Sequence, residues 1–464
     1  MTYIRQFQMR VFVRNVCTSR RIAEGLVCAA LCVALTGCAG GNSVATTTTI
    51  NPPVATPQSA SLFGRVIGGQ QPINGAIIQL YAAGNIGYGS AYQYVTGTSL
   101  LGNHSVVTSG SGDFNITGDY TCPSSSTQVY IEAIGGVPIA GEAANPNIIT
   151  LAALGPCGNL PSVSFITINE LTTVASVWAL APFMTGPSNI GTSPTNSIGL
   201  SNAFASVNKL VNTIDGALGG PTLPAGASIP TTELDTLADI IASCINTAGG
   251  GTAGDGSACG NLFALAVSST GTKPTDVVTA ALNIAHNPTQ NAAALNKLAD
   301  ATAPFQPILA SAPTAWTVAI QYPSMGLSAP TGIAADQSGN LWVTNATSHS
   351  VTLLSPSGAV TATYASGQSG SGAIAIDLSG NAWVADDTSG SLLEIAPSGT
   401  TTTTTGGGLS SSTNSLAIDG SGDVWAVGTG SHLSVFTSSG NPVSPTGYSG
   451  GGLSNGQTLA ITPQ

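Results

Sequence analysis

The sequence contains very few charged residues. They make up 6% of its 464 residues, whereas an average soluble protein has about 25%. Of the 9 basic residues only four lie beyond Arg21, namely Arg65, Lys209, Lys273 and Lys297. Because only Glu24 of the 20 acidic residues precedes residue 38, the rest of the chain has 4 basic and 19 acidic residues and a net charge of −15. A body with this charge is repelled by phosphate backbones, which argues against a nucleic-acid partner.

Long apolar runs are missing after residue 40. The mean hydropathy is +0.29, but the apolar residues are mostly Ala, Val, Ile and Leu interrupted by Gly, Ser and Thr. No stretch approaches the roughly 20 apolar residues that a membrane-spanning helix needs. We therefore expect a folded exported protein with an uncharged polar surface rather than an integral membrane protein.

The first 37 residues have the pattern of a secretion signal. A basic stretch ends at Arg21, an apolar core follows over 25–35, and Leu35-Thr36-Gly37-Cys38 comes next. This tetrapeptide resembles the bacterial lipobox, which implies a lipoprotein signal peptide over 1–37 and lipidation of Cys38. An ordinary signal with an incidental cysteine is the alternative. Because Ala39 rather than Asp follows, we expect sorting to the outer membrane of a double-membraned bacterium, on its periplasmic or outer side.

Residues 38–60 are rich in Gly, Ser, Thr, Pro and Ala, and they predict a flexible tether. Four cysteines remain beyond it, and an even number in an exported chain favours disulfides, with three possible pairings. We favour the pairing that is local in sequence, because each pair then lies within one predicted domain. It joins Cys122 to Cys157 and Cys244 to Cys259. No CxxC spacing or nearby histidine supports a zinc site.

Residues 61–150 predict a small β-sandwich. Over 75–81 the residues Ala76, Ile78 and Leu80 alternate to one face, and Gly-rich turns separate further strands. The order Gly64-x-Val66, Gly75-Ala76, Ile78-x-Leu80 and Gly112-x-Phe114 resembles carboxypeptidase-regulatory-like (transthyretin-like) modules. That resemblance implies a spacer or a carbohydrate-proximal accessory without catalytic residues.

Residues 151–302 predict an α-helical domain of about five helices. Apolar residues recur at i, i+3, i+4 and i+7, as in a helix with one buried face. These sets are Leu171, Val174, Ala175 and Trp178; Phe204, Val207, Val211 and Ile214; and Leu234, Leu237, Ile241 and Ile245. A further helix over about 276–285 ends before Asn287-Pro288. Gly249–Gly256 lacks the lysine and the preceding strand of a phosphate-binding loop, and is expected to be a simple connection.

Residues 303–464 contain a repeat with a period near 40. Asp-x-Ser-Gly-Asx-x-Trp occurs three times, 41 and then 42 residues apart. Its members are Asp336, Gly339, Asn340 and Trp342; Asp377, Gly380, Asn381 and Trp383; and Asp419, Gly422, Asp423 and Trp425. One Trp per unit of this length is typical of β-propeller blades. The units resemble NHL-type repeats, and they predict a partial propeller of three blades plus a first strand at 459–462.

Each member of the motif has an expected structural role. The Asp caps a tight turn through its side chain, the Gly takes a positive φ, and the Asx tolerates the neighbouring left-handed position. The Trp packs between adjacent blades. In the second unit we expect strands over 373–376, 382–385, 392–395 and 400–405. A strand over 316–322 is a candidate for the outer strand that latches the propeller.

Two alternatives assign chemistry to the repeats. The Asp-x-Ser-Gly-Asx loops space oxygen ligands as calcium loops do, but no bidentate Glu follows and a turn explains every residue. Propellers that resemble streptogramin lyases need a histidine base and a metal-binding Glu, and the repeats offer only His349, His432 and Glu394. The family's acid and metal positions are not matched. We also expect His104 and His286 to be surface or capping residues.

The sequence therefore predicts a multidomain chain: a small β-sandwich, an α-helical domain and a partial propeller. We expect a lipid-anchored cell-envelope protein that acts as a non-catalytic scaffold for a protein or glycan partner. No catalytic residue, metal or cofactor is predicted. A propeller lyase or hydrolase is the alternative function. An incomplete ring also leaves an apolar blade face that invites self-association.

Overall fold

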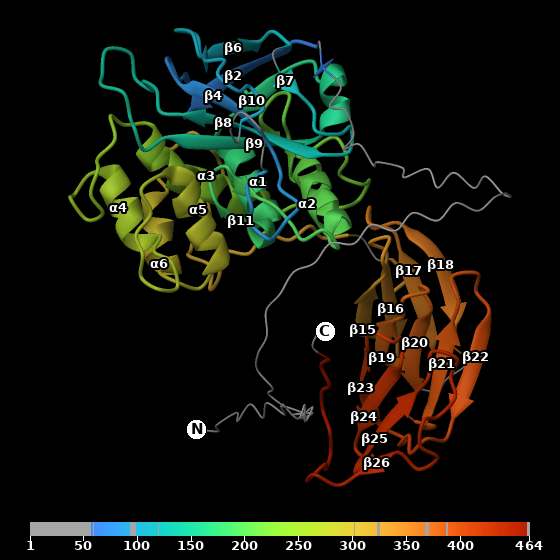
Figure 1. The fold of residues 1–464 in the computed structure, drawn as a ribbon. Coiled ribbons are helices and arrows are strands. Elements are labelled where there is room, and N and C mark those ends of the chain that lie inside the picture. The colour runs from blue at the N-terminus through green and yellow to red at the C-terminus, as the bar shows by residue number, and fades with distance from the viewer. Residues whose placement is uncertain are drawn as a thin grey trace, which may run out of the picture. The chain divides into compact units, whose positions relative to one another are not determined.

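The computed structural model describes residues 57–461, apart from residues 59, 93–98, 119, 301, 323–324, 367–370 and 387 (Figure 1). The predicted signal peptide, Cys38 and most of the predicted tether lie outside the described residues. None of the described helices combines the length and the apolar character needed to cross a membrane. We call residues 60–322 the N-terminal body and residues 325–461 the repeat segment.

The N-terminal body contains two four-stranded β-sheets. In the outer sheet β2 lies between β6 and β10 and continues into a hairpin with β3, and the middle sheet has the order β5-β4-β8-β9. The outer strands are β2 (Leu62–Gly68), β3 (Gln71–Pro72), β6 (Asp113–Ile116) and β10 (Ile166–Ile168). The middle strands are β4 (Ile77–Ala82), β5 (Val106–Val107), β8 (Gln128–Ile134) and β9 (Ile149–Pro156).

Burial along the strands shows that the body has three layers. Residues of β2 alternate between buried and exposed, so one face of the outer sheet meets solvent. Almost every residue of β8 and β9 is buried, which requires cover on both faces of the middle sheet. The outer sheet covers one face, and helices that contact β8 and β9 cover the other (Figure 1). The middle sheet is thus the centre of the body.

The helical layer agrees with most of the predicted periodicity. Its helices are α1 (Glu170–Leu180), α2 (Ser197–Leu210), α3 (Thr231–Ile245), α4 (Ala258–Leu265), α5 (Val277–His286) and the short α6 (Ala292–Leu295). The predicted face of α3 is buried, that of α1 is buried except for the half-buried Trp178, and α5 ends at the Asn287 cap. The α2 prediction extends too far, because Val211 begins the hairpin of β13 (Val211–Asn212) and β14 (Ala217–Leu218).

The structure differs from the domain boundary expected at residue 150. Strand β9 pairs with β8 in the middle sheet, and β10 pairs in parallel with β2 in the outer sheet. The hydroxyls of Thr173 and Ser176 on α1 accept the backbone N–H groups of Leu151 and Ala153, at 3.0 and 3.1 Å. The helix thereby satisfies the outer edge of β9. A single apolar core extends from Leu62 to Trp316, so sandwich and helices form one body.

The repeat segment forms three four-stranded antiparallel sheets in chain order. The first repeat sheet contains β15 (Pro330–Ala335), β16 (Leu341–Asn345), β17 (Ser350–Leu354) and β18 (Val360–Ala365). The second contains β19 (Ser371–Ile376), β20 (Ala382–Asp386), β21 (Ser391–Ile395) and β22 (Thr401–Thr405). The third contains β23 (Thr413–Ile418), β24 (Val424–Gly428), β25 (His432–Phe436) and β26 (Tyr448–Ser449). The four strands predicted for the second unit are therefore confirmed.

The stretch 302–322, which we call the α3 strap, belongs to the N-terminal body. Three acceptors on one face of α3 bind its backbone N–H groups: Asp239 binds Phe305 at 3.1 Å, Thr236 binds Leu309 at 2.8 Å, and Glu233 binds Thr317 at 2.9 Å. Trp316 is 1% exposed within the core. The expected propeller latch over 316–322 is thus wrong for this stretch, because no strand forms there and its apolar residues fill the N-terminal body.

Two carboxyl groups beside the strap are buried. Glu170 accepts the N–H of Gly69 at 2.8 Å through Oε1, and Asp239 holds the strap through Oδ1. The second oxygen of each has no hydrogen-bond partner among the described residues. Burial raises the pKa of each group to about 7, and the negative charge of Asp239 adds to the effect on the pKa of Glu170. Burial therefore shifts both carboxyl groups toward the protonated form relative to the unfolded chain.

We predict that the protein is more stable at pH 5 than at pH 8. Since burial raises the pKa of Glu170 from 4.5 to about 7, the folded chain holds more protons than the unfolded chain between these values. The free energy of unfolding is therefore highest near pH 4.5 and falls as the pH rises to 7. Thermal melts from pH 5 to 8 measure this slope. Glu170→Gln should reduce it, whereas Glu142→Gln at an exposed position should leave it unchanged. A melting temperature that rises with pH would contradict the prediction.

Candidate functional site

The three repeat motifs form the same hydrogen-bonded turn. Asp377 Oδ1 accepts the backbone N–H groups of Ser379 and Asn381 at 2.9 and 2.8 Å. Its Oδ2 accepts Asn381 Nδ2 at 3.0 Å and the indole N–H of Trp383 at 3.1 Å. Asp336 makes the equivalent four bonds, and Asp419 makes three because Asp423 replaces the asparagine. The turn thus uses both oxygens of each carboxylate.

The other members of the motif fill two further roles. Gly339, Gly380 and Gly422 have φ values of +80°, +83° and +85°, as expected. The Asx positions differ from the expectation, because none of them has a positive φ. Instead Asn340 and Asn381 donate their side-chain amides to the motif Asp. Burial tends to raise the pKa of Asp336, but the bonds from Asn340, Trp342 and Ser338 together lower it.

The motif tryptophans pack between neighbouring repeat sheets. Trp342 is 1% exposed and lies in a core with Ala382, Val384 and other residues of the second sheet. Trp383 is fully buried against Leu416, Val424 and Phe436 of the third. Trp425 is only half-buried. The motif tryptophan is therefore almost fully buried where the following repeat sheet packs against it.

The structure does not bring together the candidate acid–base residues of the repeats. His349 lies in the turn between β16 and β17, and His432 begins β25 after the corresponding turn of the third sheet. Glu394 lies on β21 opposite Trp383, where its Oε1 accepts Asn381 Nδ2 at 2.9 Å. Glu394 belongs to the second repeat sheet, whereas His349 precedes β17 of the first and His432 begins β25 of the third. Glu394 therefore interacts with the motif turn rather than with either histidine.

The other residues singled out from the sequence are the four cysteines and two histidines of the N-terminal body. The disulfides join Cys122 to Cys157 and Cys244 to Cys259, as favoured from the sequence. His286 lies at the end of α5 with Nε2 at 2.8 Å from the carbonyl oxygen of Ala181. His104 is exposed before β5. Among the described residues, no group of three His, Cys, Asp or Glu side chains is placed to hold a metal ion.

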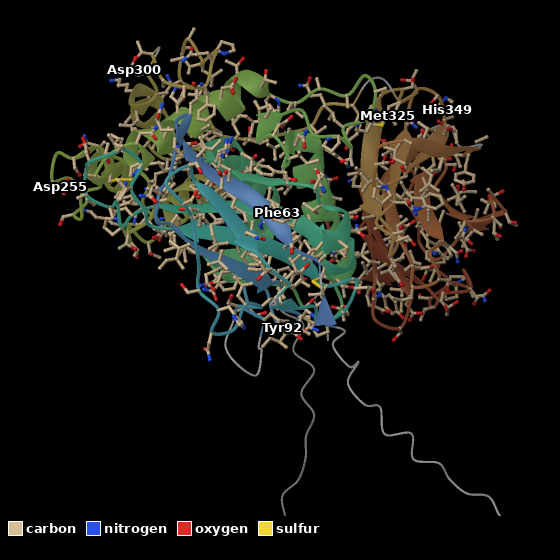
Figure 2. The ribbon with its side chains drawn as sticks, turned by 90° about the horizontal axis from the view of Figure 1, so that it is seen from above. Phe63, Tyr92, Asp255, Asp300, Met325 and His349 are labelled. Carbon is tan, nitrogen blue, oxygen red and sulfur yellow. A yellow bond between two sulfur atoms is a disulfide. The ribbon has the colours of Figure 1, made fainter. Side chains whose placement is uncertain are left out.

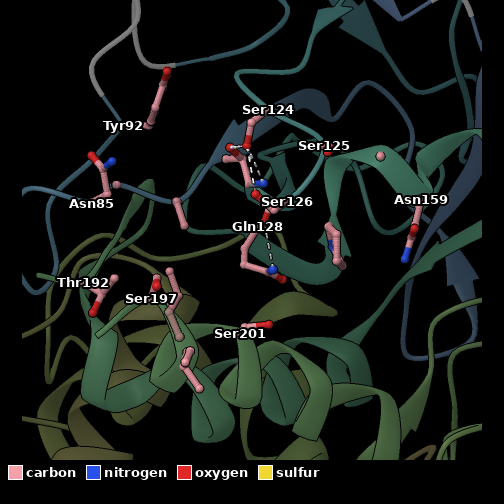
Figure 3. Close-up of a pocket in the computed structure, with 17 residues that line it drawn as sticks. Asn85, Tyr92, Ser124, Ser125, Ser126, Gln128, Asn159, Thr192, Ser197 and Ser201 are labelled. Carbon is pink, nitrogen blue, oxygen red and sulfur yellow. Dashed lines mark hydrogen bonds between the residues drawn. The ribbon is translucent and has the colours of Figure 1, made fainter. Parts of the chain in front are cut away.

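A groove of about 680 Å³ lies in the N-terminal body, between the loop that precedes β8 and the start of α2 (Figure 3). This volume is within the usual range of ligand sites, roughly 300–1,000 Å³. We call it the serine groove. Its hydroxyl groups come from Ser124, Ser125, Ser126, Thr127, Thr192, Ser197 and Ser201, and its side-chain amides from Asn85, Gln128 and Asn159. Tyr92, Ile198 and Leu200 add aromatic and aliphatic surface.

Covalent and backbone bonds hold the walls of the serine groove in place. We call the loop over 122–127, which precedes β8, the serine loop. The disulfide Cys122–Cys157 joins it to the turn that carries Asn159. Backbone N–H groups of Cys157 and Gly158 donate to the carbonyl oxygens of Thr127 and Ser125, at 2.8 and 2.9 Å. On the opposite side Gly84 exchanges backbone bonds with residues 190 and 192, just ahead of α2. A preformed groove loses little conformational entropy when it binds a ligand.

The described lining of the groove is polar but uncharged, and one of its side-chain amide oxygens has no hydrogen-bond partner. None of its described lining residues is Asp, Glu, Lys, Arg or His. Gln128 is 7% exposed, and its Nε2 donates to the carbonyl oxygen of Ser126 at 3.2 Å. Its Oε1 is buried and has no hydrogen-bond partner among the described residues. A buried acceptor without a partner costs about 1–3 kcal/mol of folding free energy.

Sequence reasoning did not find the serine groove. Its residues come from segments near 84–92, 124–128, 156–159 and 192–201, and no short motif links them. The run Ser124-Ser-Ser126 beside Cys122 was the one local signal. It becomes informative only when the disulfide and α2 are placed around it.

Comparisons with known proteins give no family assignment. No family model matches the chain, and no curated protein matches it. Among solved structures, a streptogramin B lyase aligns at 18% identity over 26% of this chain and 41% of its own, with a TM-score of 0.24. A virginiamycin B lyase from Staphylococcus aureus aligns at 19% identity over 24% and 39%, with a TM-score of 0.23. Hydrazine synthase from Kuenenia stuttgartiensis aligns at 16% identity over 30% and 40%, with a TM-score of 0.25. The chain spans less than half the length of each of these proteins.

We predict that Asp377→Ala destabilises the repeat segment more than Asp419→Ala does. The first change removes the acceptor of four donors, of which the indole N–H of Trp383 is buried and the side-chain amide of Asn381 keeps its bond to Glu394, and it should lower the free energy of unfolding by about 2 kcal/mol. Asp419 has one bond fewer and Trp425 is more exposed, so we expect about half that cost. Chemical denaturation followed by tryptophan fluorescence measures the difference. Ser379→Ala, in the same turn, is the control and should change stability little; equal losses at Asp377 and Asp419 would refute the ranking.

Proposed function

We propose that this chain is an exported, lipid-anchored binding protein of the bacterial cell envelope. In this proposal Cys38 carries the lipid, the tether separates the folded part from the membrane, and the N-terminal body binds a protein or glycan without catalysing a reaction. The observation that carries it is the serine groove, which has the size of a ligand site and presents hydroxyls and amides rather than acid–base pairs. The disulfides fit an oxidising compartment outside the cytosol.

The repeat segment has a supporting role in this proposal. Its three sheets follow one another in the chain, and their first strands β15, β19 and β23 lie side by side. Thr344 of the first sheet donates to the carbonyl oxygen of Gly372 in the second at 2.9 Å. We take the sheets as blades of an NHL-type propeller that provides a scaffold, because every motif residue is used in folding the turn or packing the sheets.

Lipid anchoring predicts that Cys38 is indispensable for membrane attachment. In bacteria that express the full chain, labelled fatty acid should be incorporated into the wild type and not into Cys38→Ala. Two or more acyl chains give durable attachment, so the wild type should stay with membranes in high salt. Cys32→Ala, within the same leader, is the matched control and should be labelled normally. Labelling or salt-resistant membrane attachment of Cys38→Ala would disprove the anchor.

The binding proposal predicts a specific envelope ligand. The mature lipid-anchored protein, purified in detergent, is tested on arrays of bacterial and environmental glycans and on separated envelope proteins. We expect binding to at least one class, with no turnover of the bound ligand detected by mass spectrometry. Blank results on both kinds of array would refute the binding function. Conversion of a ligand into a new product would favour the enzymatic alternative.

A further inference from the structure

Three large side chains are exposed to solvent at one edge of the serine groove. Ile86, Tyr88 and Ile198 are 68%, 54% and 44% exposed. Asn85, next to Ile86, lines the groove together with Ile198. Asn196, two residues before Ile198, donates its side-chain amide to Tyr88 Oη at 2.7 Å. The three exposed side chains therefore lie on adjoining elements, and we call them the apolar rim. Groups of such side chains mark protein or membrane contacts, whereas single ones are common on any surface.

Hydrogen bonds and packing hold the loop over 84–91, which carries two members of the apolar rim. The backbone N–H groups of Gly84 and Gly87 donate to carbonyl oxygens of the segment that precedes α2, at 2.8 and 3.0 Å. The ring of Tyr88 stacks on Phe183, with 5.7 Å between the ring centroids. The apolar rim is thus displayed on a preformed surface, which loses little conformational entropy when it contacts a partner.

The segments around the apolar rim carry no charge. None of the residues 83–92, 121–131 and 183–208 is Asp, Glu, Lys, Arg or His. The chain beyond residue 38 nevertheless has 19 acidic and only 4 basic residues, so its negative charge lies on other segments. A bilayer surface with anionic headgroups repels those acidic segments but not the uncharged segments around the rim. This side of the N-terminal body can therefore approach a membrane.

The chain enters the N-terminal body beside the same groove. Strand β1 (Pro57–Gln58) pairs with β7 (Tyr120–Thr121), and the serine loop follows β7 directly. That loop faces the start of α2 across the groove. Cys38, the proposed lipid site, is 19 positions before Pro57, and flexible tethers of this length have root-mean-square spans of roughly 25 Å. The proposed anchor is therefore tied to the body on the side that carries the apolar rim.

We propose that the apolar rim docks on the bilayer that holds the lipid anchor, with Ile86, Tyr88 and Ile198 at the level of the headgroups. This inference rests on the proposed lipid anchoring and adds a second point of membrane contact. Tyrosine suits this depth, because its ring is apolar and its hydroxyl stays among polar groups. The two isoleucines contribute by leaving water. The tether favours a bilayer over a second copy of the chain, because it keeps the bilayer permanently within reach of the rim.

The test uses the mature lipid-anchored protein in vesicles of phosphatidylethanolamine and phosphatidylglycerol. The four cysteines of the body form disulfides, so a single added cysteine can be labelled with an environment-sensitive dye. Lipids with a spin label near the headgroup should quench the dye at Ile86→Cys or Ile198→Cys roughly threefold more strongly than the dye at Phe63→Cys. Phe63 is the matched control, because it is 48% exposed on β2 of the outer sheet (Figure 2).

A charged variant tests the rim without disturbing the fold. Ile86 is 68% exposed, so Ile86→Asp should leave the melting temperature near that of the wild type. It removes apolar contact and is repelled by anionic lipid, so quenching of the dye at Ile198→Cys should fall to the level of Phe63→Cys. Phe63→Asp should leave the quenching at Ile198→Cys unchanged.

Three outcomes would overturn the docking. Quenching at Ile86→Cys that is no stronger than at Phe63→Cys, in protein lipidated at Cys38, would refute it and leave the lipid-anchored binding function standing. A dye at Ile86→Cys that is shielded from water only at a high ratio of protein to lipid, without quenching by lipid, would assign the rim to a second copy of the chain. Absence of a lipid on Cys38 would refute the proposed anchoring and, with it, the docking.

Discussion

The N-terminal body depends on one constraint, the burial of strands β8 and β9 of its middle sheet on both faces. Strands β8 and β9 are covered on both faces, so neither can exist without the outer sheet and the helices. The edge of β9 is closed by hydroxyls of α1, and the β10 strand that follows β9 returns to pair with β2. The serine groove lies where β8 begins and α2 starts, so the same packing that buries the sheet fixes the walls of the groove.

Hydrogen bonds from backbone N–H groups to acidic side chains take the place that ion pairs have in most proteins of this size. The one ion pair among the described residues joins Arg65 and Asp113 at the surface of the outer sheet. Elsewhere carboxylates accept backbone N–H groups, as Asp300 does from Thr302 and Asp336 from its own turn. A carboxylate used in this way fixes a loop without a basic partner. With so few cations available, acidic residues stabilise connections rather than charged networks.

Local features could be predicted from the sequence, and features that join distant segments could not. The repeat motif was interpretable because Asp377 bonds residues two, four and six positions ahead, all within the same turn. The strands of the second repeat sheet followed from that turn. By contrast, β10 pairs with a strand about 100 residues earlier, and nothing near Ile166 indicates it. Trp316 has the composition of a strand, but its burial under α1 and α3 depends on acceptors that only the folded helix aligns.

The serine groove shows why a site of this kind escapes sequence reasoning. Serine and asparagine are common throughout this chain, so their presence in four separate segments carries no signal. The unpartnered Oε1 of Gln128 does not mark the groove either, because several other buried side-chain atoms of the described residues, such as Tyr130 Oη and Thr150 Oγ1, also lack a partner. The serine groove becomes recognisable only when the disulfide, the loop before β8 and the start of α2 are placed together, because its neutral side chains form no short motif.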